Sequence, residues 1–96
     1  MKFKKFLKSF INSPILNSLL RNAYCGLPNS QLELAKYYLF ETDDFIEAYA
    51  WADVAYCRNI PGSHAIKREA EERLKPEQIK MAWDLARKYK QAFIPK

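Results

Sequence analysis

The chain has 96 residues, which is the size of a single domain. Hydrophobic residues make up 49% of it and aromatic residues 15%, with only two glycines and five prolines, so a packed core is expected and low-complexity disorder is excluded. The formal net charge of +5 comes from residues 1–25, which carry five basic side chains and no acidic one, whereas residues 26–96 carry eleven of each.

The sequence contains no signal for a membrane-spanning or secreted protein. No run approaches the roughly 20 apolar residues that cross a bilayer. Lysines interrupt the N-terminal stretch that a secretory signal would keep apolar, and two cysteines do not make a disulfide framework. A cytoplasmic, reducing setting is therefore expected.

The first predicted element is a basic amphipathic helix over residues 1–12, in which apolar residues recur at spacings of three and four and lysines back the stripe. Three roles remain open for it: a cap over the open end of the domain, an anchor on an anionic membrane surface, or a contact with nucleic acid. The cap is favoured, and nucleic acid is not expected because no known motif accompanies the lysines. The segment is defined by Lys2, Phe3, Lys4, Lys5, Phe6 and Lys8.

Residues 13–96 are predicted to form one helical domain that begins with two helices of ordinary amphipathic pattern. The first covers residues 14–24 and starts at a Ser-Pro pair, which suits an N-cap followed by the first helical position. The second is opened by Pro28-Asn29-Ser30, where Ser30 and Glu33 have the spacing of a capping box, and it ends before the tight connection at residues 41–44.

Residues 44–58 form the most apolar stretch of the chain, with apolar side chains on nearly every side of the predicted helix. Such a helix is normally covered by neighbours all round, so we expect it to be the central buried helix of the domain. Asp53 interrupts it. Because a buried carboxylate without a partner is costly, Asp53 is expected to pair with a neighbouring Arg or Lys, although it could instead point into a binding groove.

Two more helices complete the pattern, and no segment is predicted to be a strand. The helix after Pro61-Gly62 is expected to be capped by Ser63 and to lie at the surface, with pairs of opposite charge four residues apart: Lys67–Glu71, Arg68–Glu72 and Glu69–Arg73. The last helix starts near Pro76 and ends before Pro95. The side chains expected to turn inward are Ile79, Ala82, Trp83, Ala86 and Tyr89 or Phe93.

An internal repeat connects the two halves of the domain. Residues 23–30 and 55–63 both contain Ala-Tyr-Cys, one or two spacers, a branched aliphatic residue, Pro, a turn residue and Ser. The offset of 32 to 33 residues is the length of one helix–turn–helix unit in a helical solenoid.

The repeat carries a resemblance to a known family. Asp44, Ala48 and Trp51 match the pattern D-x-x-x-A-x-x-W, with Leu34-Ala35 and Tyr38 before it, Ala55 after it, and Leu74-Lys75-Pro76-Glu77-Gln78 at the start of the last helix. Over about residues 28–90 the chain thus resembles the Sel-one-like branch of the tetratricopeptide-like superfamily. It departs from the pattern at four positions: Ala35, Glu41, Tyr56 and Lys75.

The resemblance implies a fold and a binding face. It implies a short right-handed α-solenoid of antiparallel helix pairs, with five to six helices in total. In this family the first helix of each unit lines the concave surface, which would hold a peptide or a partner's helix. The partner-binding residues expected on this basis are Lys36, Tyr37, Phe40, His64, Lys67 and Arg68.

The residues that most often carry chemistry show no catalytic or metal-binding signature. Cys25 and Cys57 occupy equivalent repeat positions and are expected to be small buried residues, too far apart for a disulfide. His64 is the only histidine and is expected to be a surface or packing residue. No glycine-rich phosphate loop is present, so no catalytic residue, cofactor, metal or small-molecule substrate is expected.

These observations favour a non-enzymatic protein–protein interaction module, such as a small adaptor, inhibitor or regulator that docks on a larger protein. The alternative is a peripheral membrane-associated protein anchored by the basic amphipathic segment over residues 1–12. An enzyme that uses Asp53 and His64 is the least supported class.

Overall fold

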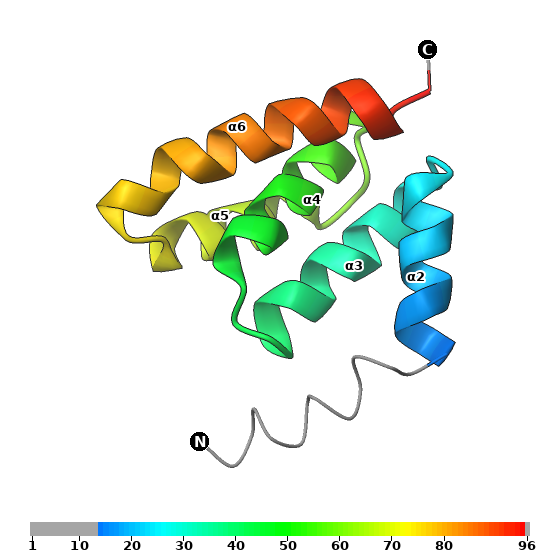
Figure 1. The fold of residues 1–96 in the computed structure, drawn as a ribbon, viewed down its shortest axis with the longest axis horizontal. Helices are drawn as coiled ribbons and strands as arrows, with labels where there is room; N and C mark the ends of the chain where they lie inside the picture. The colour runs from blue at the N-terminus through cyan, green and yellow to red at the C-terminus, as the bar shows by residue number, and fades with distance from the viewer. Residues whose placement is uncertain (1–13, 96) are drawn as a thin grey trace.

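Five helices follow one another along residues 14–95, the part of the chain that the computed structural model describes. They are α2 (Pro14–Tyr24), α3 (Pro28–Phe40), α4 (Phe45–Cys57), α5 (Ser63–Arg73) and α6 (Pro76–Phe93) (Figure 1). No strand occurs in this part of the chain, so the predicted all-α fold is confirmed. The basic amphipathic helix predicted over residues 1–12 lies outside the described residues.

Helix α4 lies in the middle of the fold. It packs against α3, α5 and α6, and Figure 1 shows these helices arranged around it. All eight residues from Ala48 to Ala55 are buried, which confirms the prediction of a central helix covered on every side. Its alanines let the neighbouring helices approach closely, and Trp51, which is only 1% exposed, fills the space beside them.

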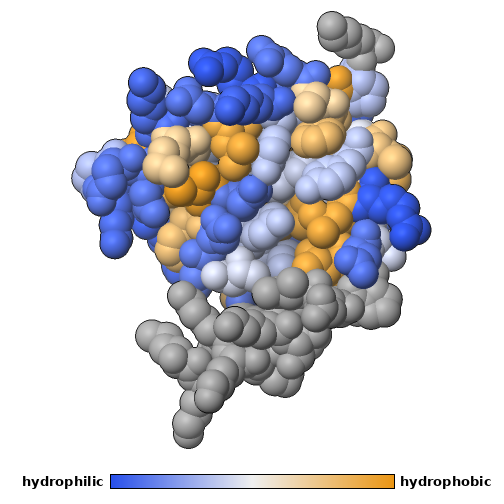
Figure 2. Space-filling view, viewed as in Figure 1, coloured by the Kyte–Doolittle hydropathy of each residue, from blue (hydrophilic) through white to orange (hydrophobic). Residues whose placement is uncertain are grey.

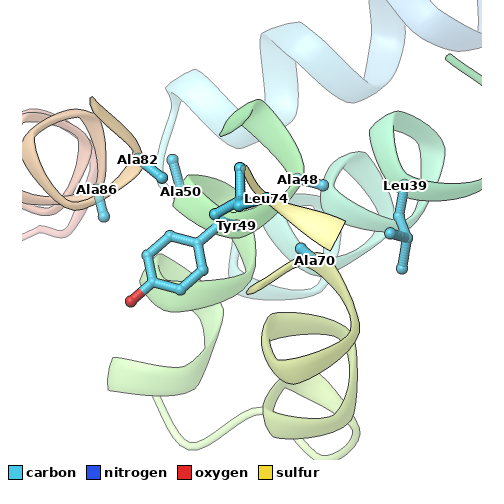
Figure 3. Packing of buried hydrophobic residues seen from close by; sticks show 8 residues of the cluster. All are labelled: Leu39, Ala48, Tyr49, Ala50, Ala70, Leu74, Ala82 and Ala86. Atoms are coloured by element: carbon cyan, nitrogen blue, oxygen red, sulfur yellow. The ribbon is translucent and has the colours of Figure 1, made fainter. Parts of the chain in front are cut away.

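The buried side chains form two clusters, one on each side of α4. One cluster joins α4 to α5 and α6, and Figure 3 shows its alanines packed around Tyr49 and Leu74. The other joins α4 to α2 and α3 and contains Trp51 and Val54. α4 contributes buried residues to both clusters, and Tyr38, Ile66 and Tyr89 pack against both, so the two clusters form one continuous core around this helix.

Two aromatic residues that were expected inside lie at the surface. Trp83 is 54% exposed, because the line of α6 that faces α4 follows Ala82 and Ala86, and residue 83 falls about 100° around the helix from residue 82. Tyr56 is 44% exposed, because burial along α4 ends at Ala55, one residue earlier. Neither ring is needed to fill the core.

The helices start at prolines or at a cap, although not always at the expected residue. The Asp44 side chain accepts a hydrogen bond from the Glu47 N–H (3.2 Å) and caps α4. The predicted capping box at Ser30 is wrong, because α3 already starts at Pro28 and residue 30 lies in its first turn. The predicted cap at Ser63 is also wrong: Gly62, with φ +88°, takes the cap position, and the Ser63 hydroxyl donates to the Ile60 carbonyl (2.6 Å).

The two repeat copies end their helices in the same way. In each copy a residue with positive φ, Gly26 (+90°) or Asn59 (+61°), donates its N–H to a carbonyl three residues earlier. The next residue, Leu27 or Ile60, donates to a carbonyl five residues earlier, which completes a Schellman turn. These turns are 33 residues apart, whereas the Ala-Tyr-Cys segments are 32 apart, so the inserted residue of the second copy is Arg58.

The prediction that Cys25 and Cys57 are buried is wrong. Both are exposed and both are free thiols. Each lies where its helix ends, and the buried position near each helix end is instead occupied by an alanine two residues earlier, Ala23 or Ala55, with 0% exposure.

The packing order agrees only in part with a regular array of helix pairs. Helices α3 and α5 contact each other, and so do α4 and α6, as successive pairs would. Helix α2, however, packs mainly on α3. The all-helical architecture is thus established for residues 14–95, and the solenoid arrangement remains a proposal.

A buried amide ties four chain segments together. The Gln31 side chain is fully buried, and its Nε2 donates to the Ala23 carbonyl (3.0 Å) and to the Phe93 carbonyl (2.9 Å). Its Oε1 accepts from Arg58 Nη1 (3.3 Å), and the same guanidinium donates to the Gly26 carbonyl. One side chain of α3 therefore links the ends of α2 and α6, and connects through Arg58 to the end of α4.

Replacing this amide by a side chain of similar size tests its contribution. Gln31→Leu removes the amide donor from the Phe93 and Ala23 carbonyls and the acceptor from Arg58, although the Ala23 carbonyl keeps the Gly26 N–H and Arg58 keeps the Gly26 carbonyl. We therefore expect the free energy of unfolding to fall by about 1 to 3 kcal/mol. Urea denaturation measures this loss. Gln91→Leu, at an exposed position of α6, is the matched control and should change stability by no more than about 0.5 kcal/mol. Equal stability of the two variants would show that the linkage is unimportant.

Candidate binding surface

Asp53 is the one acidic residue among the buried positions of α4, and two lysines hold it. Its Oδ1 lies 2.9 Å from Lys67 Nζ on α5, and its Oδ2 lies 2.9 Å from Lys90 Nζ on α6. Its side chain is 8% exposed, whereas the side chains of Lys67 and Lys90 are 23% and 35% exposed. The expectation that Asp53 pairs with a neighbouring basic residue is confirmed, and the pair of lysines bridges α5 and α6 over α4.

The charge states of this group follow from its contacts. Burial alone would raise the pKa of Asp53, but the hydrogen bonds and charges of Lys90 and Lys67 outweigh burial and hold it below its usual value. Burial lowers the pKa of Lys67, but its hydrogen bond to Asp53 outweighs this effect, and the net pKa is raised. The hydrogen bond to Asp53 likewise raises the pKa of Lys90. All three groups are therefore ionised at neutral pH, and each carboxylate oxygen of Asp53 already accepts from a lysine.

An exposed aromatic ring lies next to Lys67, which Asp53 links to Lys90. Lys67 Nζ lies 4.6 Å from the centroid of the Tyr56 ring, and the His64 ring lies 5.3 Å from it. The Tyr56 ring belongs to neither core cluster. We call Tyr56, His64, Lys67 and Lys90 the Tyr56 surface.

The six partner-binding residues expected from the sequence fall into separate groups. His64 and Lys67 meet at Tyr56, whereas Arg68, their neighbour on α5, lies 4.0 Å from Glu72. Lys67 pairs with Asp53 and not with Glu71, because the carboxylate of Asp53 lies in a drier environment than a surface glutamate. The expected pair of Glu69 and Arg73 forms at 2.9 Å.

The other three expected residues lie on α3. Lys36 forms an ion pair with Glu33 (3.2 Å). Tyr37 packs edge-on against Tyr38 at 5.9 Å, and its hydroxyl is buried with no hydrogen-bond partner among the described residues. Phe40 is 57% exposed at the end of the helix. None of these three side chains contacts the Tyr56 surface in the part of the chain described.

A second aromatic site lies where α2 and α6 end. Tyr24 stacks on Phe93 (centroids 4.9 Å apart) and on Trp51 (5.9 Å), and it remains 53% exposed. Beside it is a cavity of about 230 Å³ that residues 24–26 and 92–95 line. A Cβ atom on Gly26 would come within 2.8 Å of Pro95, so the two walls of this cavity touch at the turn. On the face shown in Figure 2, hydrophilic side chains follow the outer edge along α6, and apolar patches lie below it.

Glu47 and Tyr89 form a further polar contact between α4 and α6. The Tyr89 hydroxyl donates to the Glu47 carboxylate, with its oxygen 2.6 Å from Oε1 and 2.9 Å from Oε2. Burial raises the pKa of Glu47, although the hydrogen bond from Tyr89 partly opposes it. Burial and the hydrogen bond to Glu47 raise the pKa of Tyr89, which therefore remains a donor.

Lys90, Arg58 and Gln31 could not be singled out from the sequence. Lys90 lies in α6 among other exposed basic residues, and nothing in its local pattern marks it as the partner of an acid 37 residues away. The only available signal was Asp53 itself, whose charge in an apolar helix required a partner.

Metal and membrane sites were also considered over residues 14–95. There, no group of three or more His, Cys, Asp or Glu side chains is placed to hold a metal ion. None of the helices in this part of the chain combines the length and the apolar content needed to cross a bilayer.

In comparisons with known proteins, no protein-family model, curated protein or solved structure matches the chain.

Removing the buried carboxylate tests the lysine bridge. Asp53→Asn should lower the free energy of unfolding at neutral pH by about 1 to 3 kcal/mol, because two charge-assisted hydrogen bonds are lost. Since the folded pKa of Asp53 lies below its usual 3.8, its stabilisation is present above that pH and is lost as the pH falls through the folded pKa. The difference in the free energy of unfolding between the native chain and the variant should therefore shrink in acid. Urea unfolding at neutral pH and at a pH below the folded pKa of Asp53 measures it. Asp84→Asn, which removes an exposed pair with Arg87 (3.4 Å), is the control and should cost less than about 0.5 kcal/mol.

Glu47→Gln should have the opposite pH dependence. Because the folded pKa of Glu47 is raised above 4.5, ionisation of Glu47 opposes folding, and the native chain loses this part of its stability as the pH rises through the folded pKa. Glutamine keeps an acceptor for Tyr89 and carries no charge, so the variant should gain stability relative to the native chain as the pH increases. Urea unfolding at several pH values from below to above the folded pKa of Glu47 measures the difference in the free energy of unfolding. A variant that becomes less stable than the native chain as the pH rises would contradict this account.

Proposed function

We propose that the chain is a non-enzymatic protein–protein interaction module, a small adaptor, inhibitor or regulator that docks on a larger protein. The observation that carries this proposal is Tyr56, whose ring is 44% exposed on a fully packed helix and is held between His64 and Lys67. Aromatic side chains in fixed positions are the commonest anchors of protein interfaces, because they bury a large area at a small entropic cost.

Tyr56 is a better anchor than the other exposed rings. The Tyr24 ring already stacks on Trp51 and Phe93, so part of its surface stabilises the fold. Tyr56 is in neither core cluster, and its ring contacts are with charged or titratable side chains. By the resemblance to Sel-one-like repeats, a small residue would be expected at this position, and the chain has a large aromatic one.

The same resemblance supports a wider binding face on a short solenoid. In this proposal α3 and α5, which contact each other, present Lys36, Tyr37, Phe40, His64, Lys67 and Arg68 toward the partner. The proposed setting is the cytoplasm, where the two exposed thiols would remain reduced. The Tyr56 surface shares His64 and Lys67 with this face.

Tyr56→Ala is expected to abolish capture of the partner. When the immobilised full chain is incubated with lysate and bound proteins are quantified by mass spectrometry, a specific partner should decrease by about tenfold or more in the variant, as for a hot-spot residue. Trp83→Ala, which removes an aromatic residue of α6 that is 54% exposed, is the control and should retain the partner. If every captured protein is retained by Tyr56→Ala, or if Trp83→Ala is the variant that loses it, the proposed surface is wrong.

A further inference from the structure

We propose that the Tyr56 surface binds an acidic segment of a partner protein, in which carboxylates flank an aromatic side chain. This inference rests on the proposed function and adds the chemistry of the partner. It follows from three properties of the surface: the sign of its accessible charge, the fixed positions of its lysines, and the aromatic ring beside Lys67.

The accessible charge of the surface is positive. Lys67 and Lys90 contribute two ammonium groups and Asp53 one carboxylate, and the carboxylate is the least exposed of the three. An approaching segment therefore meets the ammonium groups first. His64 lies in the first turn of α5, where the helix dipole also favours a negative partner. The nearest other acid on α5 is Glu71, one turn beyond Lys67 on the side away from His64, and it limits the positive area.

The two lysines are already ordered before a partner arrives. A free lysine loses rotamer freedom when it binds an anion, and this loss is one reason why surface ion pairs contribute little. Here Asp53 holds both ammonium groups at 2.9 Å, so part of that cost is met when the protein folds. Each ammonium group has three N–H donors, and one bond to Asp53 leaves donors for the oxygens of a ligand.

The Tyr56 ring adds an apolar contact beside Lys67. Tyr56 is 44% exposed although Lys67 and His64 lie next to its ring, so part of the residue is open to a partner. An aromatic side chain of the partner can pack there in an offset or edge-on arrangement. Carboxylates on either side of that residue would then reach Lys67 and Lys90. Neither a purely acidic nor a purely aromatic segment would use both features.

Peptide titration of the full chain tests this chemistry. Three peptides of equal length would be added to the isotope-labelled protein, with cores Glu-Phe-Glu, Gln-Phe-Gln and Glu-Ala-Glu, and backbone NMR shifts would be followed. The Glu-Phe-Glu peptide should shift the signals of Tyr56, His64, Lys67 and Lys90 and should bind about 3- to 10-fold more tightly than either other peptide. Its advantage should decrease with added salt.

A charge-matched pair of variants separates the surface from general attraction. Asp53→Asn, Lys67→Gln and Lys90→Gln together remove one net positive charge without stranding the buried acid, and should abolish the preference for Glu-Phe-Glu. Lys88→Gln removes one positive charge from an exposed position of α6 and should keep the preference. Loss of the preference in the second variant would overturn the proposal.

Several outcomes overturn the inference independently of the proposed function. It fails if Gln-Phe-Gln binds as tightly as Glu-Phe-Glu, if none of the peptides shifts the Tyr56 surface, or if an oligonucleotide or an anionic vesicle binds there more tightly. The proposed function survives these results as long as a protein partner is lost in Tyr56→Ala. The proposed function alone fails if the acidic peptide binds as expected but no captured protein is lost in Tyr56→Ala.

Discussion

The burial of the middle of α4 is the constraint on which the rest of the structure depends. Eight consecutive residues from Ala48 to Ala55 are buried, which in a domain of this size requires neighbours on every side of this part of the helix. Helices α3, α5 and α6 supply them directly, and α2 covers the far side of the Trp51 cluster. The short side chains of α4 set how closely these helices approach, so the dimensions of the core follow from its alanines.

The same constraint creates the candidate binding surface. A buried charged residue is stable only when its charge is paired. Asp53 forms ion pairs with one lysine of α5 and one of α6. The lysines thereby become fixed at the edge of the core, next to the point where α4 leaves it at Tyr56. The packing of the core and the proposed binding surface thus depend on the same three charged groups.

Local signals predicted the helices well, and they did not predict the partners of polar side chains far away in the sequence. The pattern of residues 44–58 identified the central helix, and Pro76 marked the start of the last helix, as the structure confirms. The two predicted serine caps failed, since proline or glycine at those sites decides where the helix begins. These choices depend on a few backbone angles near each turn.

Only part of the candidate site could be predicted from the sequence. His64 and Lys67 were expected at a binding face, and Asp53 was expected to find a basic partner. That the partner includes Lys90, and that the exposed ring is Tyr56, depends on how α6 packs across α4. Contacts between residues 30 or more positions apart leave no periodic trace in one sequence, so the position of α6 had to come from the structure.

The inserted Arg58 changes the relation between the two repeat copies. The turns after α2 and α4 have the same hydrogen-bond pattern. Only the second segment carries the guanidinium that donates to the Gly26 carbonyl and to Gln31. The two turns are thereby joined in one direction: the turn after α4 supplies the donor, and the turn after α2 supplies the acceptor. A change at Arg58 would therefore act on the end of α2 as well as on the end of α4.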